Sequence, residues 1–296
     1  MSRAKVAVVQ FPGVNCEAES VRAVERVGLT AEVFRWTRAP AELAAFDACV
    51  LPGGFSYQDR VRAGALAAKH PLVEWVARAA ERGRPVLGIC NGAQVLVEAG
   101  LVPGGGEVEL ALARNRMPGR SGYYARWVHV RVERSHCVFT RALDPGTLLA
   151  LPVAHGEGRF TSSVPGRIAA LARAGQTPLR YTDASGALAT GFPANPNGAA
   201  GAVAAVCNAA GNVLAMMPHP ERAQDLGQLS RAIGGAWGDR RDQALESAGA
   251  APAAVPGAPA RAAGRRAASA GPAGRTEAPG PGLLLFEGLR LHLEEA

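Results

Sequence analysis

One cysteine lies between two glycines in the segment GICNG, which covers residues 88–92. The apolar run before it is typical of a strand and a helical pattern follows as far as Ala99, so the chain must turn sharply at Cys90. Glycines two positions before and after the cysteine remove Cβ atoms that would collide in such a turn. This is the layout of a nucleophile elbow with cysteine in place of serine. A helix N-terminus favours thiolate over thiol, so the pattern predicts that Cys90 is a nucleophile, although a free cysteine more commonly fills a core.

A cysteine nucleophile needs a base, and the base needs a group that orients it. Two His-x-Glu sequences could supply both, and each follows an apolar strand pattern: HGE at 155–157 and HPE at 219–221. The proline of the second sequence fixes its φ angle and stiffens the pair, whereas the glycine of the first leaves it loose. The residues themselves therefore favour His219 with Glu221 only slightly and leave His155 with Glu157 as an open alternative.

A developing oxyanion needs backbone N–H donors, and paired glycines end an apolar strand in the segment LPGGFSYQDR at 51–60. Gly54 can complete an oxyanion hole together with the N–H of Asn91, the residue after the nucleophile. A plain turn is the commoner meaning of two glycines at a strand end. The first strand is followed by FPGVNC rather than GxGxxG, and no P-loop motif occurs, so nucleotide binding through either motif is not expected.

Strand and helix patterns alternate through the first hundred residues. Strand patterns occur at AKVAVVQ, AEVFRW, FDACVL and RPVLGI, and helical spacing follows at 17–28, 71–82 and 90–99. Strands separated by helices imply a parallel sheet with helices on both faces. The middle of the chain adds further strand patterns, including ARWVHVRVE, AVAAVCN and NVLAMMP. We therefore expect one α/β domain with a mixed, mainly parallel sheet.

Composition divides the chain into three parts. Residues 1–236 are assigned to the α/β domain. Residues 237–282 are rich in Ala, Pro, Gly and Arg, and are predicted to be a disordered insertion because they carry too few large apolar residues to offset their ordering entropy. Residues 283–296 follow the pattern of an amphipathic helix, with Leu285 and Leu289 among its apolar positions, and this helix is expected to pack on the same domain.

The chain of 296 residues is 48% hydrophobic and 19% charged, which is typical of a globular protein. Its net charge of +7 is raised by four arginines in the Ala-rich and Pro-rich stretch, and no basic stripe interleaved with aromatic residues occurs, so nucleic-acid binding is not expected. No apolar run reaches the length of a membrane span, and no signal-peptide pattern precedes the first strand. Five scattered cysteines without a CxxC pair argue against disulfides and a structural metal site, and for the cytoplasm. Cys16 also begins a predicted helix, so it is the serious competitor of Cys90.

Four motifs resemble those of the class I glutamine amidotransferases, which have a flavodoxin-like fold. They are GICNGAQ, LPGGFSYQDRVRAGALAA, AHGEGRF and MMPHPER. More narrowly, the last three are similar to motifs of the glutaminase subunits of phosphoribosylformylglycinamidine synthase. The likeness covers roughly residues 4–225 and the last helix.

The resemblance implies a Cys-His-Glu triad of Cys90, His219 and Glu221, which decides between the two His-x-Glu sequences. It also implies that Gln94 contacts the substrate glutamine, and that Gly54 belongs to the oxyanion segment. No metal ligand is implied.

The chain departs from the family pattern at two loop positions. Gln58 stands where glycine is usual, beside the oxyanion segment, and Ala199 follows NPNG where serine is common. Neither position belongs to the triad.

The resemblance further implies hydrolysis of L-glutamine and transfer of the ammonia to a PurL-type synthetase, together with a PurS-type small subunit. That partner would use ATP and Mg²⁺ to convert formylglycinamide ribonucleotide to formylglycinamidine ribonucleotide in purine (IMP) biosynthesis, so no cofactor is expected in this chain. The alternative is a non-catalytic or DJ-1-like cysteine protein of related fold. Such a protein would not be expected to keep HPE together with Gln94.

Overall fold

The structure is a computed structural model that describes residues 3–248 and 276–295 of the chain. Within these two ranges, nine strands form one sheet in the order β2-β1-β3-β4-β11-β10-β9-β6-β7, and β5 pairs separately with β8. The strands are β1 Lys5–Gln10, β2 Thr30–Arg35, β3 Ala48–Leu51, β4 Val86–Ile89, β5 Ala111–Arg114, β6 Tyr124–Val132, β7 Leu148–His155, β8 Glu157–Thr161, β9 Leu179–Thr182, β10 Val203–Cys207 and β11 Val213–Met216. The α-helices are α1 Glu17–Arg26, α2 Ala65–Ala68, α3 Pro71–Glu81, α4 Asn91–Glu98, α5 Arg167–Arg173, α6 Gly235–Ser247 and α7 Leu283–Glu295. Short 3-10 helices include η2 Ser56–Asp59, η3 Val138–Thr140, η5 Pro220–Arg222 and η6 Leu226–Gln228.

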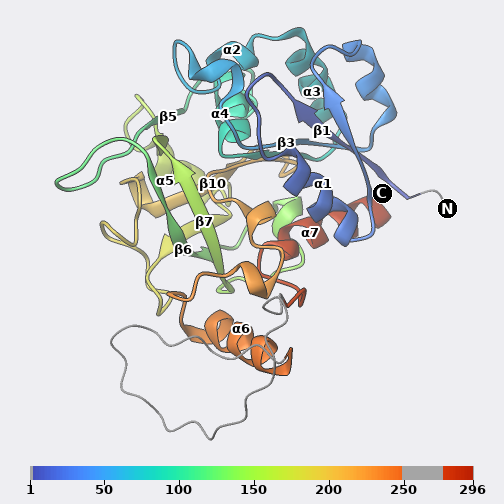
Figure 1. Cartoon of the computed structure of the whole chain (residues 1–296). Helices are drawn as coiled ribbons and strands as arrows, with labels where there is room; N and C mark the ends of the chain where they lie inside the picture. Colours follow the sequence, from blue (N-terminus) through green and yellow to red (C-terminus); the bar gives the residue numbers. More distant parts are fainter. Residues whose placement is uncertain (1–2, 249–275, 296) are drawn as a thin grey trace, which may run out of the picture.

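The sheet is mixed, which confirms the predicted α/β class. From β2 to β11 along the sheet the neighbours are parallel, and from β11 to β7 they are antiparallel. Helices α3 and α4 lie on one side of the parallel strands, and α1 and α7 lie on the other (Figure 1). Strands β3, β4 and β11 are buried along their whole length, as expected where helices cover both faces.

The prediction of a disordered insertion over residues 237–282 is partly wrong. The first part of this segment belongs to α6, where Trp237 is only 8% exposed and its indole Nε1 donates to the carbonyl of Leu148 at 2.8 Å. The last part, residues 276–282, returns to the domain, where the N–H of Gly282 donates to the carbonyl of Ala223 at 2.8 Å. Residues 249–275 lie outside the described chain.

Average composition concealed two features of this segment. One buried tryptophan supplies much of the apolar area that a helix needs in order to dock. Glycine lets the backbone of the last part approach closely, since a Cβ atom at Gly282 would lie 1.9 Å from the carbonyl oxygen of Pro220. Both features act through single residues, which an average over the whole segment does not reveal.

The last helix, α7, covers the end of the domain beside α1, as Figure 1 shows. Leu285 and Leu289 are buried in its interface. Gly288 allows close contact with η3, because a Cβ atom there would lie 2.4 Å from the carbonyl oxygen of Phe139. The residues before and after the undescribed stretch therefore pack on the same α/β domain.

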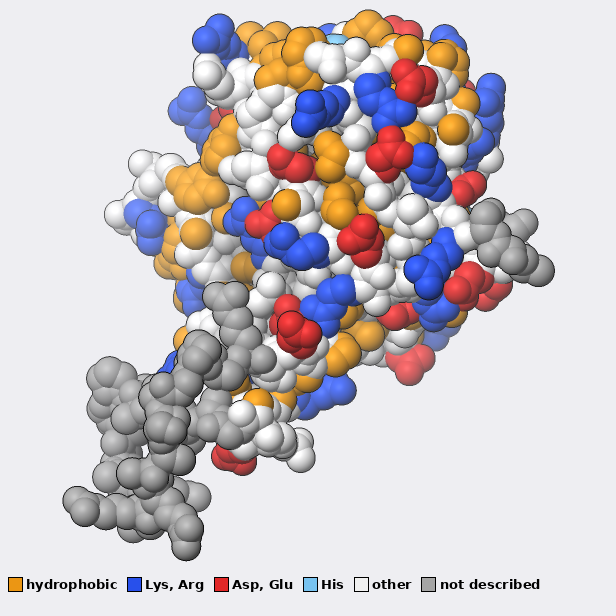
Figure 2. Space-filling model, turned by 45° about the vertical axis from the view of Figure 1, so that its right-hand side comes forward, with side chains coloured by type: hydrophobic (Ala, Val, Ile, Leu, Met, Phe, Trp, Pro, Cys, Tyr) orange, Lys and Arg blue, Asp and Glu red, His pale blue; other side chains and the backbone are white. Residues whose placement is uncertain are grey.

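Charged side chains of both signs are interspersed on the face drawn in Figure 2, with apolar side chains between them. Of the helices that the structure describes, none is both long and apolar enough to cross a bilayer.

Candidate active site

Three neighbouring parallel strands bring the predicted site residues to one edge of the sheet. The register pairs Leu51 of β3 with Gly88 of β4, and Ile89 of β4 with Met216 of β11, so the loops after these strands leave the sheet side by side. Ligands in open α/β sheets bind at such carboxyl ends. A cavity of about 40 Å³ opens there. It is lined by Asn15, Cys16, Gly54, Phe55, Cys90, Tyr123, Ala154, His219 and Arg222.

Cys90 occupies the sharp turn between β4 and α4. Its φ and ψ angles are 50° and −103°, a strained conformation for a residue other than glycine. The flanking glycines make the turn possible, because a Cβ atom at Gly88 would lie 2.7 Å from the Gly92 carbonyl oxygen and one at Gly92 would lie 1.9 Å from that of Leu51. The N–H of Cys90 donates to the carbonyl of Met216 at 2.8 Å, which anchors the turn to β11. The sulfur is thus held at a helix N-terminus, facing the cavity.

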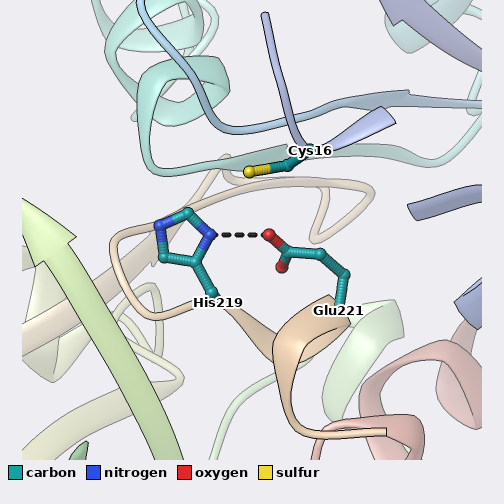
Figure 3. A group of neighbouring side chains, drawn as sticks. All are labelled: Cys16, His219 and Glu221. Atoms are coloured by element: carbon teal, nitrogen blue, oxygen red, sulfur yellow. Dashed lines mark hydrogen bonds and ion pairs between the residues drawn. The ribbon is translucent and has the colours of Figure 1, made fainter. Parts of the chain in front are cut away.

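His219 and Glu221 form a buried pair at the end of β11 (Figure 3). The ring Nδ1 of His219 lies 2.6 Å from Oε1 of Glu221, and the ring Nε2 has no hydrogen-bond partner in the part of the chain that is described. Burial alone would lower the pKa of the His219 imidazole, but the negative charges of Glu221 and Cys90 outweigh it and hold that pKa well above its ordinary value. A protonated imidazole is therefore favoured beside the Cys90 sulfur, which is the form that can protonate a leaving group.

The other His-x-Glu sequence forms no such pair. The ring Nδ1 of His155 lies 3.1 Å from Oδ1 of Asn115. The carboxylate of Glu157 points elsewhere and accepts from the N–H of Ala63 at 3.4 Å. Burial, followed by repulsion from His219, lowers the pKa of His155 to about 3, so this ring stays neutral. The structure joins the residues of HPE and separates those of HGE.

Asn91 is the first residue of α4, so its N–H lacks an acceptor within the helix and is available to an oxyanion. Its side chain holds the neighbouring loop: Oδ1 accepts from the N–H of Ser56 at 2.9 Å, and Nδ2 donates to Asp59 at 3.1 Å. Nδ2 also donates to Oε1 of Gln94 at 2.9 Å, while Nε2 of Gln94 donates to the carbonyl of Glu157 at 2.6 Å. Gln94 is therefore bonded to protein through both polar atoms and does not line the cavity. These bonds hold Gln94 between Asn91 and Glu157, and its contact with glutamine stays a prediction.

The paired glycines after β3 have separate roles. Gly54 lines the cavity, as predicted, with a φ of 147°, and a Cβ atom there would lie 2.6 Å from Cα of Val14. A Cβ atom at Gly53 would lie 2.6 Å from Cε1 of His219 and 3.2 Å from Sγ of Cys16. Sequence reasoning overlooked Gly53, since the glycine pair was visible but the ring packed against its first member was not.

Cys16 shares the cavity with Cys90, so its position at the start of α1 does bring it to the site. Its sulfur accepts a hydrogen bond from Nη2 of Arg222 at 3.1 Å. Arg222 stands directly after HPE in the sequence, and this adjacency is the only signal that pointed to it. Cys49 does not line the cavity, and burial raises the pKa of its thiol to about 12.

Two aromatic side chains that the sequence did not single out lie at the mouth of the cavity. Phe55 is 44% exposed and Tyr123 is 51% exposed, and their ring centroids are 6.2 Å apart. Phe55 follows the paired glycines, whereas Tyr123 precedes β6. The rings therefore join two separate loops across the entrance.

The loop beside the oxyanion segment is strained. Tyr57, Gln58 and Asp59 have φ angles of 53°, 60° and 51°, all in the left-handed region. Gln58 thus occupies a conformation that favours glycine, the residue expected there from the family pattern. Burial, with a contribution from the charge of Glu157, raises the pKa of Asp59 to about 6. The second departure, Ala199, is buried and does not line the cavity.

Comparison with known proteins agrees with this geometry. A family model for the CobB/CobQ-like glutamine amidotransferase domain matches residues 3–246. A protein of Methanothrix thermoacetophila named phosphoribosylformylglycinamidine synthase subunit PurQ is 45% identical over 234 residues, which are 77% of this chain and 89% of the relative. A PurQ subunit of Thermus thermophilus is 46% identical over 219 residues, or 74% of this chain and 89% of the relative. A solved structure of PurLQS from Thermotoga maritima matches with a TM-score of 0.62 and 32% identity, covering 82% of this chain and 97% of that one. The chain belongs to the glutamine amidotransferases and, among them, to the PurQ subunits of phosphoribosylformylglycinamidine synthase.

Proposed function

We propose that this chain hydrolyses the side-chain amide of L-glutamine and supplies the ammonia to a PurL-type synthetase. One observation carries the proposal: the Cys90 elbow and the hydrogen-bonded His219–Glu221 pair face the same cavity from adjacent strands. Membership of the PurQ family speaks against the alternative of a DJ-1-like protein.

The first half-reaction forms a thioester. The imidazole of His219 already holds the proton of Cys90, and the thiolate of Cys90 attacks the amide carbon of glutamine. The resulting oxyanion is stabilised by the N–H groups of Gly54 and Asn91. The protonated His219 then gives its proton to the amide nitrogen, the carbon–nitrogen bond breaks, and ammonia leaves.

The second half-reaction releases glutamate. His219 accepts a proton from water while the water oxygen attacks the thioester carbon. The carbon–sulfur bond then breaks and leaves the Cys90 thiolate beside the protonated imidazole. Throughout, Glu221 keeps Nδ1 protonated and the ring oriented. Neither half-reaction calls for a metal or an organic cofactor, and we assign ATP and Mg²⁺ to the partner.

The partner assignment rests on the family. The matching solved structure is named as PurLQS, and the relatives are named as synthase subunits. Ammonia that escapes into water is protonated and diluted, so its efficient use requires the two proteins to be docked, and we include a PurS-type small subunit in that assembly. Five free cysteines favour a reducing compartment, such as the cytoplasm.

The test compares two nitrogen sources in the assembled complex. Cys90→Ala should abolish synthesis of formylglycinamidine ribonucleotide from glutamine and leave synthesis from an added ammonium salt largely intact, because the thiol produces ammonia but does not use it. Cys49→Ala is the matched control, since Cys49 is buried in β3, and it should retain both activities. Loss of both activities in a Cys90→Ala complex that still assembles would refute the proposed role.

A further inference from the structure

The thiol of Cys16 has no part in the proposed reaction, yet it lies against the catalytic pair. A ligand atom from each of Cys16, His219 and Glu221 lies within 4.8 Å of the other two. Figure 3 shows the sulfur beside the imidazole ring, above the hydrogen bond that joins the ring to the carboxylate. Sulfur, imidazole nitrogen and carboxylate oxygen are all ligands of zinc.

The local fold holds these side chains together. The N–H of Cys16 donates to the carbonyl of Gly53 at 3.2 Å, which ties the start of α1 to the loop after β3. The missing Cβ atom of Gly53 leaves the space in which the Cys16 sulfur and the His219 ring meet. Nη2 of Arg222 donates to the sulfur from the other side, which is the kind of outer hydrogen bond that orients metal ligands.

One buried polar atom of this group is unsatisfied and has no part in the proposed reaction. Oε2 of Glu221 has no hydrogen-bond partner in the described residues, although the residue is completely buried. Buried polar atoms without partners are uncommon in folded proteins and call for an explanation. The adjoining cavity of about 40 Å³ has room for one water molecule as a further ligand.

We propose that Cys16, His219 and Glu221 form an inhibitory site for Zn²⁺. The ion replaces the proton between Nδ1 of His219 and Oε1 of Glu221 and also binds the thiolate of Cys16. Binding releases two protons, one from Nδ1 and one from the thiol, because zinc ligands must be deprotonated. Tetrahedral zinc places its ligand atoms roughly 3.5 Å apart, so small movements of these side chains complete the site.

Charge supports the assignment. The thiolate and the carboxylate carry two negative charges against the two positive charges of the ion. The positive charge of Arg222 also interacts with Glu19, and its hydrogen bond leaves the sulfur free to use a second lone pair. A bound ion holds the imidazole through Nδ1 and removes the carboxylate that orients it, so His219 no longer exchanges protons with Cys90. Binding itself does not depend on the proposed function, whereas inhibition rests on it.

The experiment measures binding and inhibition separately. The full chain is first freed of metal with a chelator. It is then titrated with Co²⁺ while the absorption band of a cobalt–thiolate bond is followed. Finally, Zn²⁺ is added to displace the cobalt. The wild type should show the band. Cys16→Ser should lose it and bind Zn²⁺ at least about tenfold more weakly, because it lacks a direct ligand. In a glutaminase assay, the concentration of Zn²⁺ that halves each variant's own activity should rise by a similar factor in Cys16→Ser.

Two further variants make the test specific. Cys90→Ser should keep the cobalt–thiolate band, since Cys90 is not a proposed ligand, and Cys49→Ala should bind like the wild type. A band that persists in Cys16→Ser and disappears in Cys90→Ser would overturn the proposal, as would equal Zn²⁺ affinities of wild type and Cys16→Ser. Circular dichroism of each variant is the check that its fold is retained. If the chain binds the ion but proves to have no glutaminase activity, the proposed function fails while the metal site stands.

Discussion

At the scale of single residues, the site depends on how His219 is held. Oε1 of Glu221 lies 2.6 Å from the ring Nδ1. The backbone of Gly53 packs against Cε1, the ring carbon between the two nitrogens. The imidazole therefore has one orienting carboxylate and one close backbone contact, and its second nitrogen is left for the reacting atoms. A change at either contact should alter the chemistry without unfolding the protein.

Replacement of the orienting carboxylate gives the first prediction. Glu221→Gln should lower glutaminase kcat by up to about 10⁴-fold, because the imidazole loses the group that fixes its protonation and orientation. Glu157→Gln should reduce kcat far less, since Glu157 does not contact His155. Steady-state kinetics on both variants is the measurement, and a larger loss in Glu157→Gln would assign the base to the HGE sequence.

Gly53→Ala tests the second contact. The added Cβ atom would lie 2.6 Å from Cε1 of His219, so the ring must move and kcat should fall while the circular dichroism spectrum stays unchanged. Gly191→Ala is the matched control, because its φ is not left-handed and a Cβ atom there meets nothing within 4 Å. Full activity in Gly53→Ala would mean that the ring position is not limiting.

Asp59 gives a pH-dependent prediction. Its pKa is raised from 3.8 to about 6, so the folded state binds a proton more tightly than the unfolded state between these values. The contribution of Asp59 to stability is therefore greatest below about pH 4 and is lost as the pH rises through about 6. Urea unfolding across this range should show Asp59→Asn gaining stability relative to the wild type as the pH rises. A difference between the two proteins that does not vary with pH would contradict the raised pKa.

At the scale of elements, the two ends of the low-complexity segment, α6 and residues 276–282, are the parts that pack on the domain. Helix α6 is tied to β7 by Trp237, and residues 276–282 pack against the loop after η5. These contacts position α7, whose buried face completes the core beside α1. Neither edge contributes a residue to the cavity lining.

Exchange of the middle of this segment should therefore be tolerated. Residues 249–275, whose largest aliphatic residue is Val255, should be replaceable by a Gly/Ser linker of equal length with little change in kcat or in the midpoint of urea unfolding. Trp237→Ala should instead destabilise the fold by about 3 kcal/mol, because it removes a buried indole. A tenfold loss of glutaminase activity in the linker variant, with the fold retained, would show that the segment acts in the reaction.

The same elements show what sequence can and cannot predict. The strands β1, β3 and β4 and the elbow at Cys90 are local patterns, so apolar runs and glycine spacing sufficed to find them. The contact of Gly53 with His219 joins distant parts of the chain, and the hydrogen bond from Gln94 to Glu157 depends on how α4 and β8 meet. The wrong prediction of disorder for the residues of α6 has a similar cause. The contact of one tryptophan with β7 docks this helix, although the segment as a whole has few large apolar residues.

At the scale of the whole molecule, the site lies at the carboxyl edge of the parallel half of the sheet, and its mouth is bordered by Phe55 and Tyr123. Both rings are about half exposed, so apolar surface faces outward at the entrance. Exposed aromatic side chains are enriched where proteins associate. A synthetase docked over this mouth would shelter ammonia from water as it leaves.

This arrangement predicts weak glutaminase activity for the chain alone and strong stimulation by its partner. The rate of glutamate formation should rise when the PurL-type synthetase and the PurS-type subunit are added, since docking closes the mouth and steadies the strained loop at 57–59. Cys90→Ala, assembled in the same way, should remain inactive with glutamine. Equal rates with and without the synthetase would show that the isolated chain already has its active geometry.

The place of β11 has a consequence for biosynthesis of the protein. This strand lies between β4 and β10 and carries His219 and Glu221 at its end, although it is made long after the elbow that holds Cys90. A nascent chain on the ribosome, or a product of premature termination before residue 219, thus lacks the proposed base. With His219 in that role, an unfinished chain should not hydrolyse glutamine, and activity should begin only after the central strand has been synthesised and inserted.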